Sequence, residues 1–372
     1  MARVPRRPRA ASRLTRLVAS RGFQKWAARF PLTRRLVRSE GEAMFDLVAG
    51  FCHSQILQAL VEFDIPQMLL RNEMTTDALA TEAEVPLDRM HVLLSAAVAL
   101  GLLKRRKSGL YALTIRGAAL AGVPGLSGMI SHHDVLYLDL ADPVAFFRGE
   151  VETELAEFWP YVFGASGATD PKVASTYSQL MADSQVLVAE DTLATVSLNG
   201  VRHIMDVGGG SGAFLAAVGQ AYPNLHMTLF DLPAVAPGAQ ARFADLGLSE
   251  RVMIAPGSFR DDPLPQGADL ISLVRVLYDH SDETVSALLR SVYEALPVGG
   301  SLLVSEPMTG GDQPQRAGDA YYALYCMAMR TGKARSADQI AALLRQAGFT
   351  DIQTPKSRRP FVTSLVTGVK QS

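Results

Sequence analysis

A glycine-rich turn carries the clearest chemical meaning in this sequence. The apolar run 204–207 leads into the turn 208–212 (GGGSG), and an apolar helical pattern starts at Ala213. Glycines let a backbone approach a ligand closely, and a following helix offers it free N–H groups. Asp231 ends the next apolar run, 19 residues after Gly212. Since a carboxylate there can accept both hydroxyls of a ribose, the spacing predicts an adenosine-containing cofactor.

The glycine spacing alone leaves two reaction classes open. Gly208, Gly210 and Ala213 also fit the pattern of dinucleotide sites, so hydride transfer and methyl transfer both remain. A turn with no ligand is a third alternative, which the acid at 231 and the order of the strands count against. The segments 273–283 and 295–307 each border a later predicted strand, and the carboxyl ends of such strands form the site in open α/β sheets. Their residues should therefore decide the class.

The elements that position these residues change character along the chain. From Val201 onward, short apolar runs alternate with helical patterns, which predicts a doubly wound α/β domain with a mainly parallel sheet. The predicted strands are 203–207, 226–230, 252–255, 270–274 and 301–305, with helices at 213–221 and 283–296 among them.

The part before this sheet is predicted to be helical. Apolar residues recur at steps of three and four, helix starts carry hydroxyl or acidic caps, and two short runs flank a Ser-Gly turn. Two helices followed by a hairpin make a winged-helix unit. The expected elements are a helical stretch at 40–70, helices from 75 and 87–101, a hairpin at 102–107 and 110–114, and a helix at 174–196.

A winged helix raises the possibility of DNA binding, because such folds place a helix in the major groove. The helix in that position, 87–100, is apolar along most of its length, and Arg89 is its only formal positive charge. A groove reader needs contacts to phosphates and bases. We therefore expect this helix to be buried and the protein not to bind nucleic acid.

The charge is concentrated at one end of the chain. The 372 residues carry a formal net charge of −1, yet residues 1–38 hold eleven arginines, one lysine and no acid. Phe23, Trp26 and Phe30 lie among these charges, which predicts an interfacial helix that contacts a membrane surface. A solvated or domain-packing helix is the alternative, and an organelle transit peptide has a similar composition.

Composition also bounds the location. Cys52 and Cys326 are the only cysteines, too few and too distant for a disulfide framework or a zinc site, so a reducing cytoplasm is expected. No run of 18 apolar residues occurs, so we expect no transmembrane helix. The basic arm would then place the protein peripherally on the inner membrane. We predict three segments: a basic arm (1–38), a helical domain (39–195) and a cofactor-binding domain (196–372).

The later motifs resemble one family. Together with the glycine turn and Asp231, the string Leu277-Tyr278-Asp279 and the turn 297–300 (PVGG) are similar to the plant-type, metal-independent O-methyltransferases, which include caffeic acid and acetylserotonin methyltransferases. The resemblance covers about residues 40 to 370. It implies a class I methyltransferase sheet, S-adenosylmethionine as the cofactor, S-adenosylhomocysteine as the product, no metal, and a homodimer formed by the N-terminal domain.

The resemblance also implies the cofactor's contacts. Asp231 would bind the ribose, residues 257–259 would flank the adenine, and Arg275 would contact the far end of the cofactor. The full set implied for the cofactor is Asp206, Gly208, Gly210, Gly212, Asp231, Leu232, Gly257, Ser258, Phe259 and Arg275.

The sequence departs from that family at its catalytic base. Where the family has a histidine, this chain has Tyr278, and where it has a second glutamate, this chain has Ala334. Glu306 keeps the family's other glutamate, which orients the base. Because a tyrosine has an ordinary pKa near 10, it is a poor base at neutral pH, although it can orient a hydroxyl. We therefore take Tyr278, Glu306 and His280 as catalytic candidates, with a surface histidine as the alternative for His280.

The tyrosine variant, the basic arm and the helix 177–184 resemble the bacterial carotenoid O-methyltransferases of phototrophs. That branch acts on a long apolar polyene with a tertiary hydroxyl, as in demethylspheroidene or hydroxyneurosporene. Tyr177, Met181, Tyr322 and Met327 would then line an apolar acceptor site, and core packing is the alternative for each. A tetrapyrrole C-methyltransferase, a catalytically dead scaffold and a winged-helix regulator remain as other functions.

Overall fold

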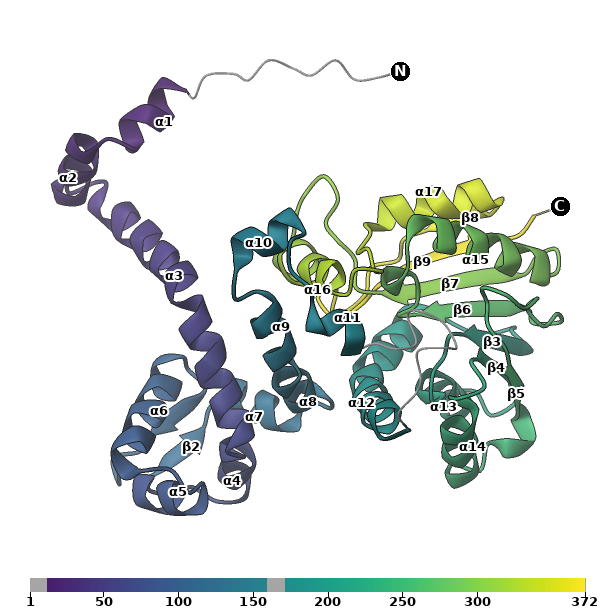
Figure 1. Ribbon diagram of the computed structural model, residues 1–372, viewed down its shortest axis with the longest axis horizontal. Helices are drawn as coiled ribbons and strands as arrows, with labels where there is room; N and C mark the ends of the chain where they lie inside the picture. Colours follow the sequence, from purple (N-terminus) through teal and green to yellow (C-terminus); the bar gives the residue numbers. More distant parts are fainter. Residues whose placement is uncertain (1–11, 159–170, 372) are drawn as a thin grey trace. The chain divides into compact units, whose positions relative to one another are not determined.

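The computed structural model describes residues 12–158 and 171–371, and of the side chains at 157–158 and 171–181 nothing is described. The chain divides into two compact units, 1–118 and 119–372. Each unit is described by itself below (Figure 1).

The first unit contains the winged-helix elements that the sequence predicts. Its hairpin pairs Leu103 with Leu113, and its core buries side chains such as Leu60, Ile65 and Met90. The elements are α1 (Arg13–Val18), α2 (Arg21–Arg29), α3 (Arg34–Glu62), α4 (Ile65–Arg71), α5 (Thr76–Glu82), α6 (Leu87–Ala99), β1 (Leu103–Arg105) and β2 (Tyr111–Leu113), and α7 (Ile115–Gly122) follows.

The helical stretch expected at 40–70 is two helices. Asp64 adopts a left-handed conformation with φ +54°, and Pro66 lies in the first turn of α4. A left-handed residue cannot continue a right-handed helix, and proline lacks the N–H that the preceding turn would need. The chain therefore ends α3 at Glu62 and begins a new helix in a different direction.

Helix α3 presents an exposed apolar surface within the first unit. Phe45, Leu47, Val48 and Phe51 are each more than 60% exposed. Its mean hydropathy reaches 1.3 over an 18-residue window, so it is long and apolar enough to cross a membrane by length and composition alone. The sequence prediction of no transmembrane helix looked only for uninterrupted apolar runs. It did not consider α3, in which polar residues lie among the apolar ones.

The second unit is built on a seven-stranded sheet in the order β5-β4-β3-β6-β7-β9-β8. The five predicted strands are confirmed as a parallel set, and two antiparallel strands that the sequence patterns did not reveal extend one edge. The strands are β3 (His203–Val207), β4 (His226–Asp231), β5 (Val252–Pro256), β6 (Leu270–Val274), β7 (Ser301–Glu306), β8 (Thr350–Gln353) and β9 (Ser364–Val369).

Helices cover both faces of this sheet, which makes it doubly wound (Figure 1). Val285 and Ile340 join the core on one face, from α15 and α17, and Val188, Phe214 and Phe243 join the core on the other, from α12, α13 and α14. These helices are α12 (Pro171–Thr195), α13 (Ala213–Ala221), α14 (Ala236–Asp245), α15 (Asp282–Ala295) and α17 (Ala337–Ala347), and the short 3₁₀ turns η3 (Ser249–Arg251) and η4 (Leu277–Asp279) precede β5 and α15.

A smaller helical cluster completes the second unit. Leu136, Phe146 and Leu155 pack with Tyr325 and Met329 in a separate apolar core. The helices that supply it are α9 (His133–Asp139), α10 (Pro143–Arg148), α11 (Glu154–Phe158) and α16 (Ala323–Ala328), and the π-helical turn η5 (Gly318–Tyr322) packs against it through Tyr321. Helix α8 (Leu126–Ser131) precedes α9. Residues 119–195 thus lie in the same compact unit as the sheet, and the functional boundary expected near 195 stays a prediction.

Candidate active site

The glycine turn joins β3 to α13 and depends on glycine for its shape. Gly208, Gly210 and Gly212 all have positive φ angles, between 58° and 74°. A Cβ at Gly212 would collide with the ring of Phe243, so both the backbone conformation and the packing require glycine there. The turn therefore places its backbone N–H groups at the carboxyl end of the parallel strands.

Asp206 lies behind this turn. Its side chain is fully buried, and Oδ1 accepts a hydrogen bond of 2.6 Å from the hydroxyl of Ser272. A Cβ at Gly209 would collide with the carboxyl of Asp206. Burial raises the pKa of Asp206 to about 7. Its position favours a role in supporting the turn over the cofactor contact that the resemblance implies.

Asp231 lies at the end of β4 and faces the turn. Its Oδ2 accepts the backbone N–H of Gly210 at 2.6 Å, and its Oδ1 accepts that of Leu232 at 2.7 Å. Burial raises the pKa of Asp231, and the two N–H groups oppose that rise. Since an ionised carboxylate has about four lone-pair positions, two remain for the hydroxyls of a ribose.

A pocket opens where these elements meet. It brings together eight of the ten residues implied for the cofactor, while Asp206 and Gly212 lie in the supporting structure. The eight are Gly208, Gly210, Asp231, Leu232, Gly257, Ser258, Phe259 and Arg275.

The pocket also contains residues that the sequence patterns did not assign. Gln185 of α12 lines it, and the Oε1 atom of Gln185 is buried without a hydrogen-bond partner among the described residues. Asp279 lines it too, and its Oδ1 atom is likewise without a partner in the described part of the chain. Buried polar atoms are nearly always hydrogen-bonded, so unpaired ones in a pocket indicate a polar ligand. With the carboxylate at 231 and the glycine turn, the amide of Gln185 and the guanidinium of Arg275 fit an adenosyl cofactor that carries an amino-acid tail.

His280 lies on the Phe259 side of this pocket. Its ring makes an edge-to-face contact with Phe259 at 5.2 Å, and its Nδ1 is 3.2 Å from Nη2 of Arg260. Burial lowers the pKa of His280 to about 4, and the charges of Arg260 and Arg335 also act to lower it. His280 is therefore neutral at pH 7 and lies beside a residue implied for the adenine, where a proton acceptor has no use.

Tyr278 is buried in the turn η4. The guanidinium of Arg275 donates to its hydroxyl at 3.4 Å and to the hydroxyl of Ser184 at 2.7 Å. Burial raises the pKa of Tyr278 well above its ordinary value. The side chain is thus a neutral phenol beside a cation, which can orient another hydroxyl but cannot act as a base at neutral pH.

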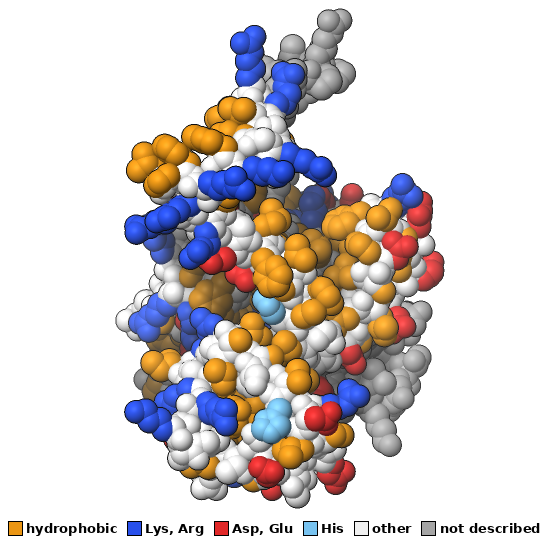
Figure 2. All heavy atoms as spheres, turned by 90° about the vertical axis from the view of Figure 1, so that its left-hand side faces the viewer, with side chains coloured by type: hydrophobic (Ala, Val, Ile, Leu, Met, Phe, Trp, Pro, Cys, Tyr) orange, Lys and Arg blue, Asp and Glu red, His pale blue; other side chains and the backbone are white. Residues whose placement is uncertain are grey.

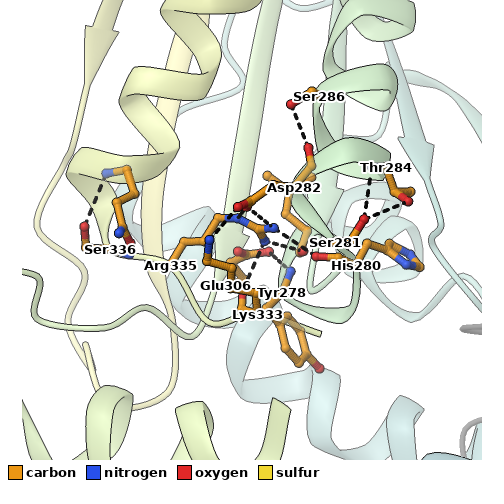
Figure 3. A network of polar contacts seen from close by, with 12 residues as sticks. Tyr278, His280, Ser281, Asp282, Thr284, Ser286, Glu306, Lys333, Arg335 and Ser336 are labelled. Atoms are coloured by element: carbon orange, nitrogen blue, oxygen red, sulfur yellow. Dashed lines mark hydrogen bonds and ion pairs between the residues drawn. The ribbon is translucent and has the colours of Figure 1, made fainter. Parts of the chain in front are cut away.

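Glu306 holds the backbone of this turn. Its Oε2 accepts the N–H of Tyr278 at 3.2 Å, while its Oε1 is buried with no hydrogen-bond partner among the described residues. Figure 3 shows Glu306 beside the turn while the ring of Tyr278 points away from it. Burial raises the pKa of Glu306 to about 8. Glu306 therefore positions the turn through its backbone, and does not contact the phenol that the resemblance had it orient.

A second clamp grips the same turn from the segment 333–335. Arg335 is 1% exposed and donates to the carbonyl oxygens of Leu277 at 2.8 Å and His280 at 2.9 Å (Figure 3). The N–H of Lys333 donates to the carbonyl of Tyr278 at 2.8 Å. The segment thus binds the turn η4 through Lys333 and Arg335. These two residues flank Ala334, which stands where the family has a glutamate.

Aromatic side chains gather near Arg275, whose charge acts on the hydroxyls of Tyr321 and Tyr322. The hydroxyl of Tyr321 is 2.6 Å from Nε2 of His133, and that of Tyr325 is 2.8 Å from Nε2 of His132. Burial lowers the pKa of both histidines, that of His132 to about 4. The adjacent pair of histidines was the signal in the sequence that could have identified this cluster.

The residues predicted for the acceptor separate in the structure. Tyr322 is partly buried, and the charge of Arg275 acts on its hydroxyl. The side chain of Met327 is 49% exposed. Tyr177 and Met181 belong to α12, and their side chains lie outside the described residues. Of the four, Tyr322 is the one that the structure places near the polar centre at Arg275.

Comparison with known proteins places this geometry among methyltransferases. The sequence matches the O-methyltransferase domain over residues 137–350 and the O-methyltransferase dimerisation domain over residues 45–122. It is 57% identical to the demethylspheroidene O-methyltransferase of Cereibacter sphaeroides, over 96% of this chain and 94% of that protein. It is 51% identical to the protein of the same name from Rhodobacter capsulatus, over 97% and 90%.

The fold has a solved counterpart with its cofactor bound. The crystal structure of human N-acetylserotonin methyltransferase in complex with S-adenosylmethionine is similar with a TM-score of 0.77 and 25% identity. The similarity covers 90% of this chain and 98% of that one. The fold of this chain is therefore shared with a protein whose structure was solved in complex with S-adenosylmethionine.

Proposed function

This chain belongs to the O-methyltransferase family, and we propose that it methylates the hydroxyl of an apolar carotenoid. Membership makes it an enzyme that uses S-adenosylmethionine, as the resemblance had implied. The observation that carries the choice of acceptor is the near full-length identity to two proteins named demethylspheroidene O-methyltransferase. Membership favours this enzymatic function over the dead scaffold and the DNA-binding regulator.

The pocket explains how the chain would hold its cofactor. S-adenosylmethionine supplies an activated methyl group when it is bound. Asp231 has free lone pairs for the ribose hydroxyls, the turn at 208–212 offers backbone N–H groups, and Phe259 offers an apolar wall for the adenine. Gln185 and Arg275 supply polar groups for the amino-acid end.

Positioning should supply most of the rate. Fixing two reactants in line is worth roughly 7–11 kcal/mol. Arg275 is held by Ser184 and Tyr278, and the turn that carries Tyr278 is clamped by Glu306. An acceptor oxygen that meets the phenol of Tyr278 would therefore encounter a fixed partner. Removal of the hydroxyl proton should contribute less, typically about 10²–10⁴-fold.

The acceptor can be identified directly. The full-length protein is incubated with isotopically labelled S-adenosylmethionine and, separately, with hydroxylated carotenoids, flavonoids and bacteriochlorophyllides in detergent micelles. We expect mass spectrometry to find the labelled methyl on a carotenoid oxygen. Label on a tetrapyrrole carbon or on a flavonoid, with none on the carotenoids, would replace the proposed acceptor. The Asp231→Asn variant serves as the control without cofactor binding.

The N-terminal unit supports assembly as a homodimer. The dimerisation domain begins at residue 45, within α3, where Phe45, Leu47, Val48 and Phe51 are exposed. Burying such side chains stabilises an interface by roughly 25 cal/mol for each Å² of apolar surface. A second copy of this chain is thus the expected cover for that part of α3.

We further propose that the basic arm binds the cytoplasmic surface of the inner membrane. Trp26 is 51% exposed and stacks on Phe30 at 4.9 Å, and Phe23 lies 5.6 Å from Trp26. Helix α2 also carries Arg21, Lys25 and Arg29, and Figure 2 shows lysine and arginine side chains beside hydrophobic ones on this face of the molecule. A basic helix with an aromatic stripe is typical of helices that lie in the headgroup region of anionic lipids.

Sedimentation with vesicles tests this location. We expect the protein to pellet with vesicles that contain anionic phospholipid, less with zwitterionic ones, and less at high salt. Substituting both Trp26 and Phe30 by serine should reduce binding, while substituting the exposed Leu246 of the other unit by serine should not. Equal binding to both vesicle types, or no loss in the double variant, would overturn the proposal.

A further inference from the structure

We propose that Asp279 accepts the proton of the acceptor hydroxyl. It would take the role of the histidine base that the family has at the position of Tyr278. The proposal rests on the methyl transfer described above and assigns its missing proton acceptor. It follows from which polar groups face the pocket, how each is held, and which of them is left without a partner among the described residues.

The reaction itself sets the requirement. The acceptor oxygen forms a C–O bond with the methyl carbon while the C–S bond breaks and its electron pair returns to sulfur. The products are a thioether, an ether and one proton. A neutral alcohol becomes strongly acidic as its oxygen shares a lone pair, so a base of moderate strength suffices if it lies within hydrogen-bond reach. A nearby carboxylate meets that requirement.

The other candidates are committed elsewhere. The phenol of Tyr278 is buried and accepts from Arg275, so it stays protonated. His280 lies against Phe259 and Arg260. Glu306 accepts the N–H of Tyr278 with Oε2, and although its Oε1 has no partner among the described residues, Glu306 does not line the pocket. None of these three presents a basic atom to the space beside Arg275.

Asp279 combines two properties that none of these three residues has together: it lines the pocket, and it has an unpaired basic atom. It lines the pocket together with Arg275 and Val276, and its Oδ1 atom is buried with no hydrogen-bond partner among the described residues. A carboxylate oxygen in that state gains a hydrogen bond when an acceptor O–H arrives. The empty position is thus suited to a donor that the substrate supplies.

The surroundings of Asp279 keep its pKa near 7. Burial raises the pKa of Asp279 to about 7, and the charge of Arg275 opposes that rise. Glu306 faces it from β7, and Cys326 faces it from α16 with a thiol whose pKa burial raises, so both are uncharged at pH 7. A carboxyl of this kind is a stronger base than an exposed aspartate and is still substantially ionised at neutral pH.

The turn η4 gives the carboxylate a fixed direction. Glu306 anchors the N–H of Tyr278, and Lys333 and Arg335 bind the carbonyl oxygens of Tyr278 and Leu277. Asp279 is the last residue of this clamped turn. The clamps therefore preorganise the proposed base, which explains why Glu306 is retained without a histidine to orient.

The test compares the pH dependence of turnover in three variants, using whichever acceptor the wild-type protein methylates. For wild type we expect kcat to fall on acidification with an apparent pKa near 7. Asp279→Asn should lower kcat about 10²–10⁴-fold and remove this acidic limb of the pH profile, in which kcat falls as the pH is lowered. Asp279→Glu should restore part of the rate and an acidic limb. The matched control Tyr278→Phe should keep the acidic limb.

Calorimetry with S-adenosylhomocysteine separates this role from cofactor binding. We expect Asp279→Asn to bind the nucleotide with an affinity within about twofold of wild type. A large loss of affinity would make Asp279 a cofactor ligand and overturn the proposal. An unaltered acidic limb in Asp279→Asn would overturn it too.

A readout without an acceptor keeps this inference separate from the choice of substrate. Carbon NMR of protein labelled at its aspartate carboxyls should show carboxyls that titrate near pH 7 for Asp279 and Asp206. One such signal should vanish in Asp279→Asn while that of Asp206 remains. If the carotenoid assay fails while both NMR signals are present, the carotenoid is wrong as the acceptor and the assignment of Asp279 as the base still stands. If the signal of Asp279 is missing, the assignment of Asp279 as the base is wrong.

Discussion

Gly210 donates its backbone N–H to Oδ2 of Asp231 over 2.6 Å. This bond ties the carboxyl end of β4 to the turn that follows β3, so the carboxylate and the glycine turn form one unit. The orientation of the carboxylate is therefore fixed before any ligand arrives, and a ribose would meet a preformed site.

Replacing Asp231 by asparagine should remove cofactor binding. Hydrogen bonds to a charged group contribute roughly 1.5–3 kcal/mol each, so losing the carboxylate should weaken S-adenosylhomocysteine binding by about 100-fold or more. Titration calorimetry measures the affinity. Asp245→Asn changes an exposed aspartate of α14 and should leave binding unchanged. Normal affinity in Asp231→Asn would refute the ribose assignment.

Replacing Tyr278 by phenylalanine should lower turnover several-fold and leave cofactor binding intact. The phenol oxygen accepts from Arg275, so its removal takes away one of the hydrogen bonds that orient the guanidinium, while the bond to Ser184 stays. Steady-state assays give kcat, and calorimetry gives the affinity for the cofactor. An unchanged kcat would remove Tyr278 from the mechanism.

Replacing Gly212 by alanine should destabilise the protein. The residue has φ +74°, and a Cβ there would collide with the ring of Phe243. Left-handed strain and overpacking each cost roughly 1–3 kcal/mol, which denaturant unfolding can measure. A Cβ at Gly238 of α14 would point into open space, so Gly238→Ala should be neutral or stabilising by up to about 1 kcal/mol. Equal stabilities would contradict the packing argument.

Acid should destabilise the cluster around His132. Burial lowers its pKa from the ordinary 6.5 to about 4, so the unfolded chain binds a proton there more readily than the folded chain. Stability is therefore lost as the pH falls from 6.5 towards 4, with a slope of up to about 1.4 kcal/mol per pH unit for this residue. His280 has a similar shift and should add a similar slope.

The His132→Gln variant isolates that contribution. Glutamine can keep a hydrogen bond to Tyr325 but does not titrate. Denaturant unfolding at several pH values should show a shallower loss of stability between pH 6.5 and 4 than in wild type. A slope identical to that of wild type would show that His132 is not neutral in the folded protein.

The sequence by itself determined the elements that rest on local patterns. The strand at His203–Val207, the helix at Ala213–Ala221 and the strand at Leu270–Val274 begin and end where their apolar runs do. The glycine turn and Asp231 could be assigned because their spacing follows from strand length and the need for positive φ. These features depend on neighbours along the chain, which the sequence displays directly.

Only the tertiary structure decided what each polar group faces. The antiparallel strands β8 and β9 were missed because their pairing joins segments far apart in sequence. Asp206 lies behind the glycine turn, and His280 lies beside Arg260. Glu306 accepts the backbone N–H of Tyr278. In the pocket, one oxygen each of Gln185 and Asp279 has no partner among the residues that the structure describes. Burial and partners fix the pKa of a group, and both are set by elements that meet only when the sheet has formed.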